Sequence, residues 1–183
     1  LPYFVDEEGN RLIEADFPLI QANTKTDKVI LTAPTGFDFY DEFKGNDTPL
    51  VTASVNNQLL TKTEDGQYFI DTTPGAYTVT WTVSDKAGNE SSIEQHVYVY
   101  PAISFTNAGE RNEESLTVNV TVSLSGTSPT YPFNVTLKAL LEEGNHAASL
   151  DDVTGLDGED TTITFEDGEL EKTIILELNN DNS

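Results

Sequence analysis

The stretch GAYTVTWTVSDKAGN, at residues 75–89, is the part of this sequence that decides its fold. Apolar side chains alternate with threonine from residue 77 to residue 83. Because side chains of a strand point alternately to the two faces of its sheet, this alternation predicts a half-buried antiparallel strand with Trp81 in the core. A second alternating run at residues 93–99 closes a hairpin. The stretch therefore predicts an all-β domain.

The turn of this hairpin, DKAGN, contains residues that favour a tight reversal of the chain. We expect Asp85 to bond the turn backbone through its own carboxylate, and Gly88 and Asn89 to supply positive φ angles. A related sequence, DEEGN, occurs at residues 6–10. It predicts a similar turn, and an ion clasped by its acidic side chains at a domain junction is the alternative.

A longer pattern around the hairpin resembles a known family. The spacing G-x-Y-x-V-x-W-x-V-x-D-x-A-G-N, followed by a final V-Y-V, is similar to the last two strands of hyalin-repeat and related bacterial immunoglobulin-like domains. The resemblance covers residues 28–100, with the earlier strands matching only as short apolar runs, and it implies an immunoglobulin-like β-sandwich. Many eukaryotic members carry disulfide cysteines, and this chain has none, which favours the bacterial branch.

The second half of the chain carries the longest uninterrupted alternation, at residues 116–124. Further runs at residues 161–165 and 172–178 flank the segment EDGE, and Asp-Gly between two β runs is a strong hairpin signal. Together with ISF at residues 103–105, this order of motifs resembles the Calx-β domain. The resemblance implies a second β-sandwich, in which the family would continue with two more strands after Ser183.

We therefore expect an all-β chain of two tandem immunoglobulin-like β-sandwiches, the second truncated. The expected division is an N-terminal segment or tail of a preceding module at residues 1–27, a hyalin-repeat-type domain at residues 28–101, and a Calx-β-like domain at residues 102–183. No flexible linker lies at Pro101, which suggests a stiff junction. Three explanations of the truncation stay open: the chain is a fragment, a neighbouring chain donates a strand, or residues 1–27 complete the sheet.

Charge restricts the partners of this chain. It holds 9 basic and 32 acidic residues, a formal net charge of −23. We do not expect nucleic acid or an anionic membrane as a partner, since binding phosphate requires Lys and Arg to displace counterions. We do not expect membrane insertion either, because no apolar run reaches the roughly 18 residues of a spanning helix. Solubility in salty surroundings and binding of a divalent cation both stay open as reasons for the acidity.

Calcium is the cation that acidic loops suit, because it takes about six to eight oxygen ligands. In the Calx-β family acidic loops at one end of the sandwich collect ions. The resemblance implies these metal ligands here: Glu110 or Glu113, Asp151, Asp152 and Asp181. Asparagines flank Asp181 on both sides and remove charge that the ion requires. A solvated loop without an ion is the alternative.

Motifs for catalysis are weak. Catalysis of the Ser–His–Asp kind needs a histidine held against a hydroxyl, and we expect His96, on a strand, and His146, in a polar loop, to be surface residues. Neighbouring carboxylates such as Glu142 and Glu143 arise by chance in so acidic a chain. We therefore predict that the protein is not an enzyme.

Aromatic and acidic residues interleave in FDFYDEF, at residues 37–43. Such a surface could stack on sugar rings. The preferred interpretation is that the aromatics, Tyr40 included, pack in the core while the acids, Asp38 included, face water.

The sequence predicts a non-catalytic structural spacer, adhesin-like, within a large secreted or cell-surface bacterial protein, with Ca2+ stiffening its loops. Its partners would be the neighbouring domains of a longer polypeptide, together with a polysaccharide or a cell-surface protein. The alternative is a carbohydrate-binding accessory module of a secreted enzyme.

Overall fold

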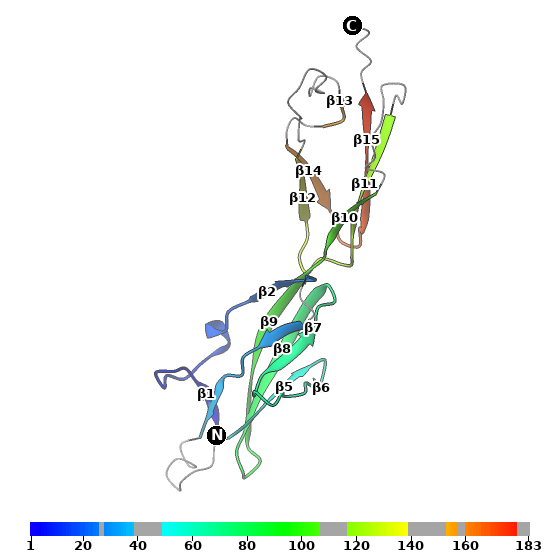
Figure 1. The fold of residues 1–183 in the computed structure, drawn as a ribbon. Coiled ribbons are helices and arrows are strands. Elements are labelled where there is room, and N and C mark those ends of the chain that lie inside the picture. Colours follow the sequence, from blue (N-terminus) through cyan, green and yellow to red (C-terminus); the bar gives the residue numbers. More distant parts are fainter. Residues whose placement is uncertain (26–27, 39–48, 107–116, 139–152, 157–159, 179–183) are drawn as a thin grey trace. The chain divides into compact units, whose positions relative to one another are not determined.

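The computed structural model is all-β, as predicted: its described residues form strands and one short 3-10 helix, η1 (Glu14–Asp16). The chain divides into two compact units, Leu1–Tyr100 and Pro101–Ser183, coloured blue to green and green to red in Figure 1. The structure describes residues 1–25, 28–38, 49–106, 117–138, 153–156 and 160–178.

The described residues of the first unit form nine strands. They are β1 (Tyr3–Val5), β2 (Ile20–Asn23), β3 (Lys28–Leu31), β4 (Thr35–Phe37), β5 (Leu50–Val55), β6 (Gln58–Leu59), β7 (Tyr68–Asp71), β8 (Gly75–Ser84) and β9 (Glu90–Tyr100). A five-stranded sheet has the order β2-β9-β8-β5-β6, and two further pairs are β3-β7 and β1-β4. All pairs are antiparallel except β2 and β9, which run parallel.

The hairpin of β8 and β9 is the central element of this unit. Its register runs from Gly75 opposite Val99 to Ser84 opposite Glu90. Val79, Trp81 and Val83 of β8 are fully buried, as the alternation predicted.

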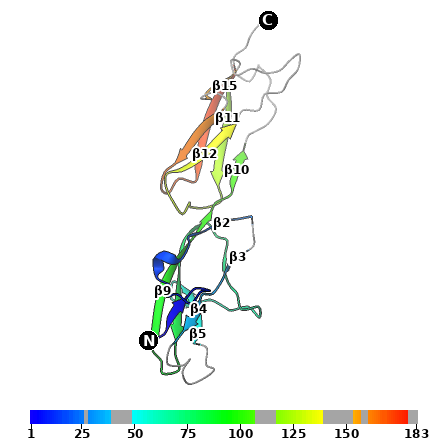
Figure 2. The same ribbon diagram turned by 90° about the vertical axis from the view of Figure 1, so that its left-hand side faces the viewer.

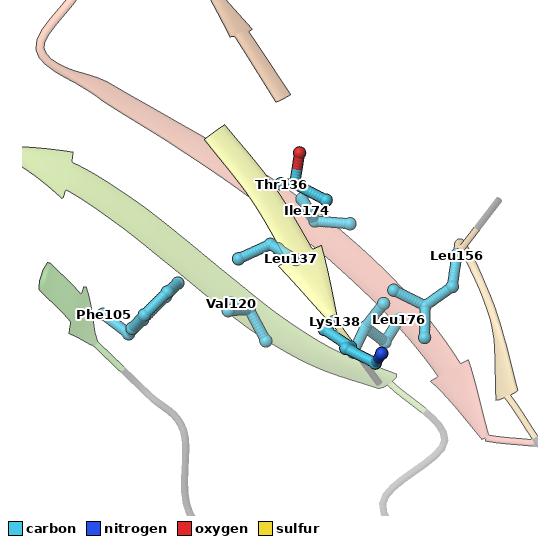
Figure 3. A pocket seen from close by; sticks show the side chains of 8 residues that line it. All are labelled: Phe105, Val120, Thr136, Leu137, Lys138, Leu156, Ile174 and Leu176. Carbon is cyan, nitrogen blue, oxygen red and sulfur yellow. The ribbon is translucent and has the colours of Figure 1, made fainter. Parts of the chain in front are cut away.

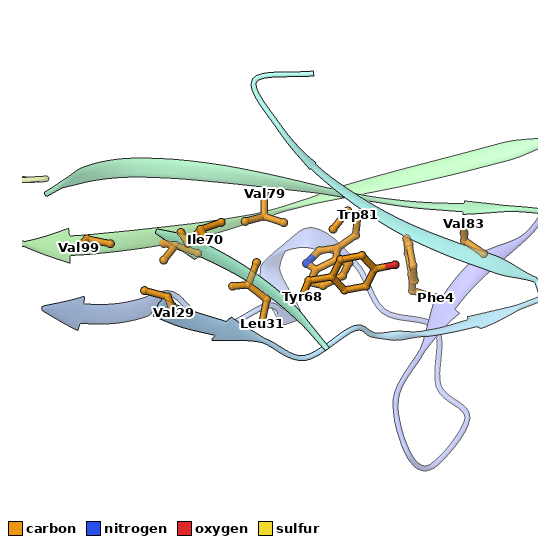
Figure 4. Packing of buried hydrophobic residues seen from close by; sticks show 11 residues of the cluster. Phe4, Val29, Leu31, Tyr68, Ile70, Val79, Trp81, Val83 and Val99 are labelled. Carbon is orange, nitrogen blue, oxygen red and sulfur yellow. The ribbon is translucent and has the colours of Figure 1, made fainter. Parts of the chain in front are cut away.

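The core of the first unit lies between the five-stranded sheet and the pair β3-β7 (Figure 4). The rings of Trp81 and Tyr68 meet edge to face, with centroids 5.4 Å apart. Such contacts add about 0.5–1.5 kcal/mol beyond the burial of the ring surfaces. The Tyr68 hydroxyl donates to the Val51 carbonyl at 2.8 Å, so the only polar atom of this buried side chain is paired.

The N-terminal residues belong to the first unit, which differs from the predicted separate segment at residues 1–27. Phe4, on β1, is 2 % exposed and packs in the same core as Trp81. β2 adds to the edge of the main sheet beside β9. The strands of this segment therefore complete the first unit, and the explanation in which they complete the second is wrong for them.

The second unit also consists of two layers of strands that pack against each other. Its strands are β10 (Ile103–Thr106), β11 (Thr117–Leu124), β12 (Phe133–Lys138), β13 (Val153–Thr154), β14 (Asp160–Phe165) and β15 (Glu171–Leu178). One sheet has the order β10-β11-β15-β13 and the other pairs β12 with β14; β10, β11, β12 and β15 are labelled in Figure 2. The buried cluster between them includes Val122, Ile163 and Phe165.

Candidate functional site

The predicted calcium ligands lie outside the described residues. This holds for Glu110, Glu113, Asp151, Asp152 and Asp181. In the part of the chain that the structure describes, no three His, Cys, Asp or Glu side chains gather closely enough to hold a metal ion.

The two D-x-x-G-N loops form the same hairpin turn. In the first, the Asn10 amide donates to Asp6 Oδ1 at 2.7 Å and its Nδ2 donates to Oδ2 at 2.9 Å. In the second, Asn89 makes the same two bonds to Asp85, at 2.8 and 2.7 Å. Both oxygens of each carboxylate accept bonds from within the turn, which confirms the structural interpretation of both loops.

The backbone of these turns explains the required residue types. Gly9 and Gly88 have φ angles of 84° and 82°, a left-handed conformation that glycine adopts without strain. Asn89 does not have the positive φ that the sequence suggested: among non-glycine residues described, only Asn56 and Asn57 do. Asn89 is needed instead as the donor to Asp85.

Hydrogen bonding shifts the acidity of the turn carboxylates. The side-chain bond from Asn10 lowers the pKa of Asp6, and the bond from Asn89 lowers the pKa of Asp85. The pKa of Glu169 in the β14–β15 turn is lowered by its bond from the Glu166 amide and by Lys172, whose Nζ lies 2.8 Å away. Each hydrogen bond that a carboxylate accepts favours its ionised state. The bonds that form these turns therefore keep the three carboxylates ionised to lower pH.

His96 is an exposed residue, as predicted. It projects from β9, and its Nδ1 lies 3.3 Å from the Thr78 hydroxyl across the hairpin. His146 lies outside the described residues.

Two residues of the aromatic and acidic stretch are described. Phe37 packs on Tyr3 with ring centroids 5.2 Å apart, as expected for a packing role. Asp38 is 7 % exposed, so the expectation that it faces water is wrong. Residues 39–43, including Tyr40, lie outside the described residues.

The second unit contains an apolar hollow of about 310 Å3 between its sheets. Figure 3 shows Val120, Leu137 and Ile174 pointing into it, with Phe105 at one side. Phe105 is 50 % exposed although it faces inward from β10. The hollow continues the core described above and presents one charged side chain, Lys138.

The first unit contains a groove of about 390 Å3 that residues of β6 and β7 line, here called the β6–β7 groove. β6 is an edge of the five-stranded sheet and β7 is an edge of the pair β3-β7. Its lining includes the half-buried residues Phe69 and Tyr77 and the polar residues Asn56, Gln58 and Asp71.

The sequence does not indicate this groove. Tyr77 belongs to the apolar face of the alternating run at residues 77–83, which predicts a packing role for it. The pair Asn56-Asn57 between two β runs is a turn signal of the type that tight hairpins require, and it could have located one rim.

No family model and no curated protein matches this chain. Two solved structures are similar over most of it. One is SGBP-B of the Bacteroides ovatus mixed-linkage glucan utilization locus, in complex with a mixed-linkage heptasaccharide: 16% identity, 100% of this chain, 41% of that chain, TM-score 0.37. The other is a Ca2+-stabilised adhesin that helps an Antarctic bacterium to bind ice: 15% identity, 95% of this chain, 39% of that chain, TM-score 0.23.

Likenesses at these TM-scores assign no function to this chain, which spans about two fifths of the length of either protein. Among the described residues, no helix has the length and apolar character needed to cross a membrane.

Proposed function

We propose that this chain is a non-catalytic, load-bearing spacer within a larger secreted or cell-surface bacterial protein. The observation that carries the proposal is the parallel pairing of β2 with β9. β2 lies near the start of the first unit and β9 ends it at Tyr100. A tensile force between the two ends of the unit loads this pair once β1 has separated from β4.

Parallel pairing places the ladder in shear under such a force. Pulling the N-terminus draws β2 in one direction along the strand axis, and pulling the C-terminus draws β9 in the other. The bonds of the register from Ile20 opposite Val97 to Asn23 opposite Tyr100 are then loaded together and do not open one by one. This geometry suits a module that transmits tension.

A buried glutamine ties the same region to the core. Gln95 Nε2 donates to the Pro18 carbonyl at 3.2 Å, just before β2. Its Oε1 accepts from Trp81 Nε1 at 3.0 Å. Gln95 is 7 % exposed, so the tie is protected from competing water. The two bonds of Gln95 therefore connect the segment just before β2 to Trp81, which is fully buried in the core.

The junction of the two units also suits a spacer. Two residues, Pro101 and Ala102, separate β9 from β10. Ala102 donates to the Ser125 hydroxyl at 2.9 Å and accepts from the Ser125 amide at 2.9 Å, so its backbone is bound within the second unit. We propose that the two units are immunoglobulin-like modules of the hyalin-repeat and Calx-β types, which their strand patterns support.

Single-molecule pulling between the two ends of the chain tests this function. A residue extends by at most about 3.3–3.6 Å, so unfolding Leu1–Tyr100 should lengthen the chain by up to roughly 33–36 nm and Pro101–Ser183 by up to roughly 27–30 nm. When the chain is pulled from its two ends, we expect the first unit to unfold at a clearly higher force than when it is pulled from Leu1 and the β8–β9 turn. The second geometry leaves the β2–β9 pair out of the line of force. Equal forces in the two geometries would refute the load-bearing role.

Proline variants of β2 give a matched pair. β2 is an edge strand, so the N–H groups of adjacent residues point alternately to β9 and to solvent. Of Gln21→Pro and Ala22→Pro, one removes a ladder bond and should lower the unfolding force, while the other should lower it less. Identical forces for both variants and the unchanged chain would contradict the proposal.

We include calcium in this proposal because the acidic residues that the Calx-β resemblance implies as ligands offer the oxygens that Ca2+ prefers. Calcium at about 100 times its dissociation constant should stabilise the second unit by roughly 2.7 kcal/mol. Melting curves with calcium and with a chelator measure this difference. Coincident curves would refute calcium binding and leave the spacer role intact.

A further inference from the structure

Residues 1–18, here called the β1 segment, precede the force-bearing strand β2 along the chain. β1 pairs with β4 and with no other described strand, through three antiparallel residue pairs centred on Phe4 opposite Gly36. While this ladder holds, tension that enters at Leu1 passes from β1 into β4 and does not load β2. The order of loading is therefore β1–β4 first and β2–β9 second.

β4 is held closely against the five-stranded sheet. A Cβ placed on Gly36 would lie 2.7 Å from Val83 Cγ2 and 2.9 Å from Val51 Cγ2, so the β4 backbone approaches β8 and β5 more closely than a side chain at this position would allow. Interiors packed this closely resist displacement of one layer from another. Tension on β1 should therefore separate β1 from β4 and leave β4 on the sheet.

The attachment of the β1 segment to the rest of the unit is limited. Phe4 is 2 % exposed and packs in the core, and the Tyr3 ring lies 5.2 Å from the Phe37 ring. Leu12 and Phe17 pack against the core but are only partly buried. The β2–β9 ladder has four residue pairs, and the buried glutamine described above bonds the chain just before it. β1 should therefore yield at a lower force than β2.

Most of the first core does not depend on the β1 segment. Among the buried residues of the core cluster that the structure describes, only Phe4 belongs to this segment, and the other ten lie on β3, β5, β7, β8 and β9. Phe4 lies toward one end of the cluster (Figure 4). Because burial of apolar surface is the main favourable term in folding, a first unit without β1 should stay folded.

We propose that the β1 segment is a reversible reserve of length, an inference that rests on the proposed spacer role. Under tension β1 leaves β4, and residues 1–18 extend by up to roughly 6 nm at about 3.3–3.6 Å per residue. When tension falls, Phe4 returns to the core. A pull on the chain is then taken up first by this step, and the β2–β9 pair is loaded only after it.

Pulling the full chain from its two ends tests the reserve. We expect a step of up to roughly 6 nm at a force below the unfolding force of either unit. The step should reverse on relaxation, before either unit has unfolded. Absence of such a step would overturn the reserve, even if the first unit still unfolds at the higher force expected of a spacer. Equal forces in the two pulling geometries would refute the spacer role, whether or not the step occurs.

A disulfide between β1 and β4 gives a second, independent test. The chain has no cysteine, so Tyr3→Cys combined with Phe37→Cys introduces a single pair at directly opposite positions. Opposite residues of an antiparallel pair have Cα atoms about 4.5–5.5 Å apart, within the roughly 4.4–6.8 Å that a disulfide spans. The oxidised variant should lose the low-force step, and a reductant should restore it. A step that persists in the oxidised variant would refute the release of β1.

Truncation of the buried ring separates the two stages of unfolding. Phe4→Ala should lower the force of the first step, because Phe4 anchors β1 in the core. It should leave the later unfolding force of the first unit unchanged, because Phe4 has already left the core by then. Phe105→Ala, which truncates an exposed aromatic of the second unit, is the matched control and should change neither force. An unchanged first step in the Phe4→Ala variant would contradict the proposal.

Discussion

Gln95→Leu should destabilise the first unit more than any other single change of an uncharged polar side chain that we consider. The substitution keeps a similar volume but removes the acceptor of the Trp81 indole N–H and the donor to Pro18. Trp81 is 0 % exposed, so water cannot replace the lost partner. Leaving a buried polar group unpaired costs about 1–3 kcal/mol, and a lost hydrogen bond about 0.5–1.5 kcal/mol.

We therefore expect a loss of about 2–3 kcal/mol in the free energy of unfolding. For a domain of this size each kcal/mol lowers the melting temperature by about 4–8 °C, so the shift should be on the order of 10–20 °C. Trp81 is the only tryptophan, so its fluorescence reports the unfolding of the first unit alone. The matched control is Gln21→Leu, the same change at an exposed position of β2, which should stay within about 0.5 kcal/mol.

A double-mutant cycle isolates the indole bond. In a Trp81→Phe background no indole N–H is left to be orphaned, so Gln95→Leu should cost about 1–2 kcal/mol less than in the unchanged chain. Calorimetry replaces fluorescence in that background. Equal melting temperatures for the Gln95→Leu and Gln21→Leu variants would refute this prediction. So would a loss of unfolding free energy from Gln95→Leu that is the same with Trp81 and with Phe at that position.

Three further outcomes follow from the structure. Phe165→Ala, at a fully buried site, should cost the second unit about 3–5 kcal/mol and leave the Trp81 fluorescence transition unchanged; equal shifts of both units would contradict their independence. Gly36→Ala would place a Cβ 2.7 Å from Val83 Cγ2, so it should cost about 1–3 kcal/mol by urea unfolding, against little for Thr35→Ala. The folded pKa values of Asp6 and Asp85 are lowered, so their stabilisation is present above the unfolded pKa of about 4 and lost as pH falls through the folded value. The urea midpoint of the double variant Asp6→Asn, Asp85→Asn should therefore fall less between pH 7 and pH 3 than that of the unchanged chain, and parallel pH profiles would count against this.

The sequence by itself determined the strands and turns that depend on local chemistry. Alternation placed Trp81 inside and the threonines of β8 outside, because the two faces of a strand are set by the period of its backbone. The D-x-x-G-N motif located its turns, because Asp85 and Asn89 are only four residues apart and bond each other directly. Asn89 shows the limit of this reasoning: composition identified the turn but not which residue would take the left-handed conformation.

Only the tertiary structure decided the features that join distant segments. Gln95 and Pro18 are 77 residues apart in sequence, and no local pattern predicts their bond. The same holds for the burial of Phe4 and for the parallel pairing of β2 with β9. Edge pairing and grooves depend on which strand ends where in the folded sheet, and hydrophobic periodicity carries no information on that. The stretch at residues 75–89 therefore predicts the all-β fold, while the residues proposed to bear force lie where other strands pair with its hairpin.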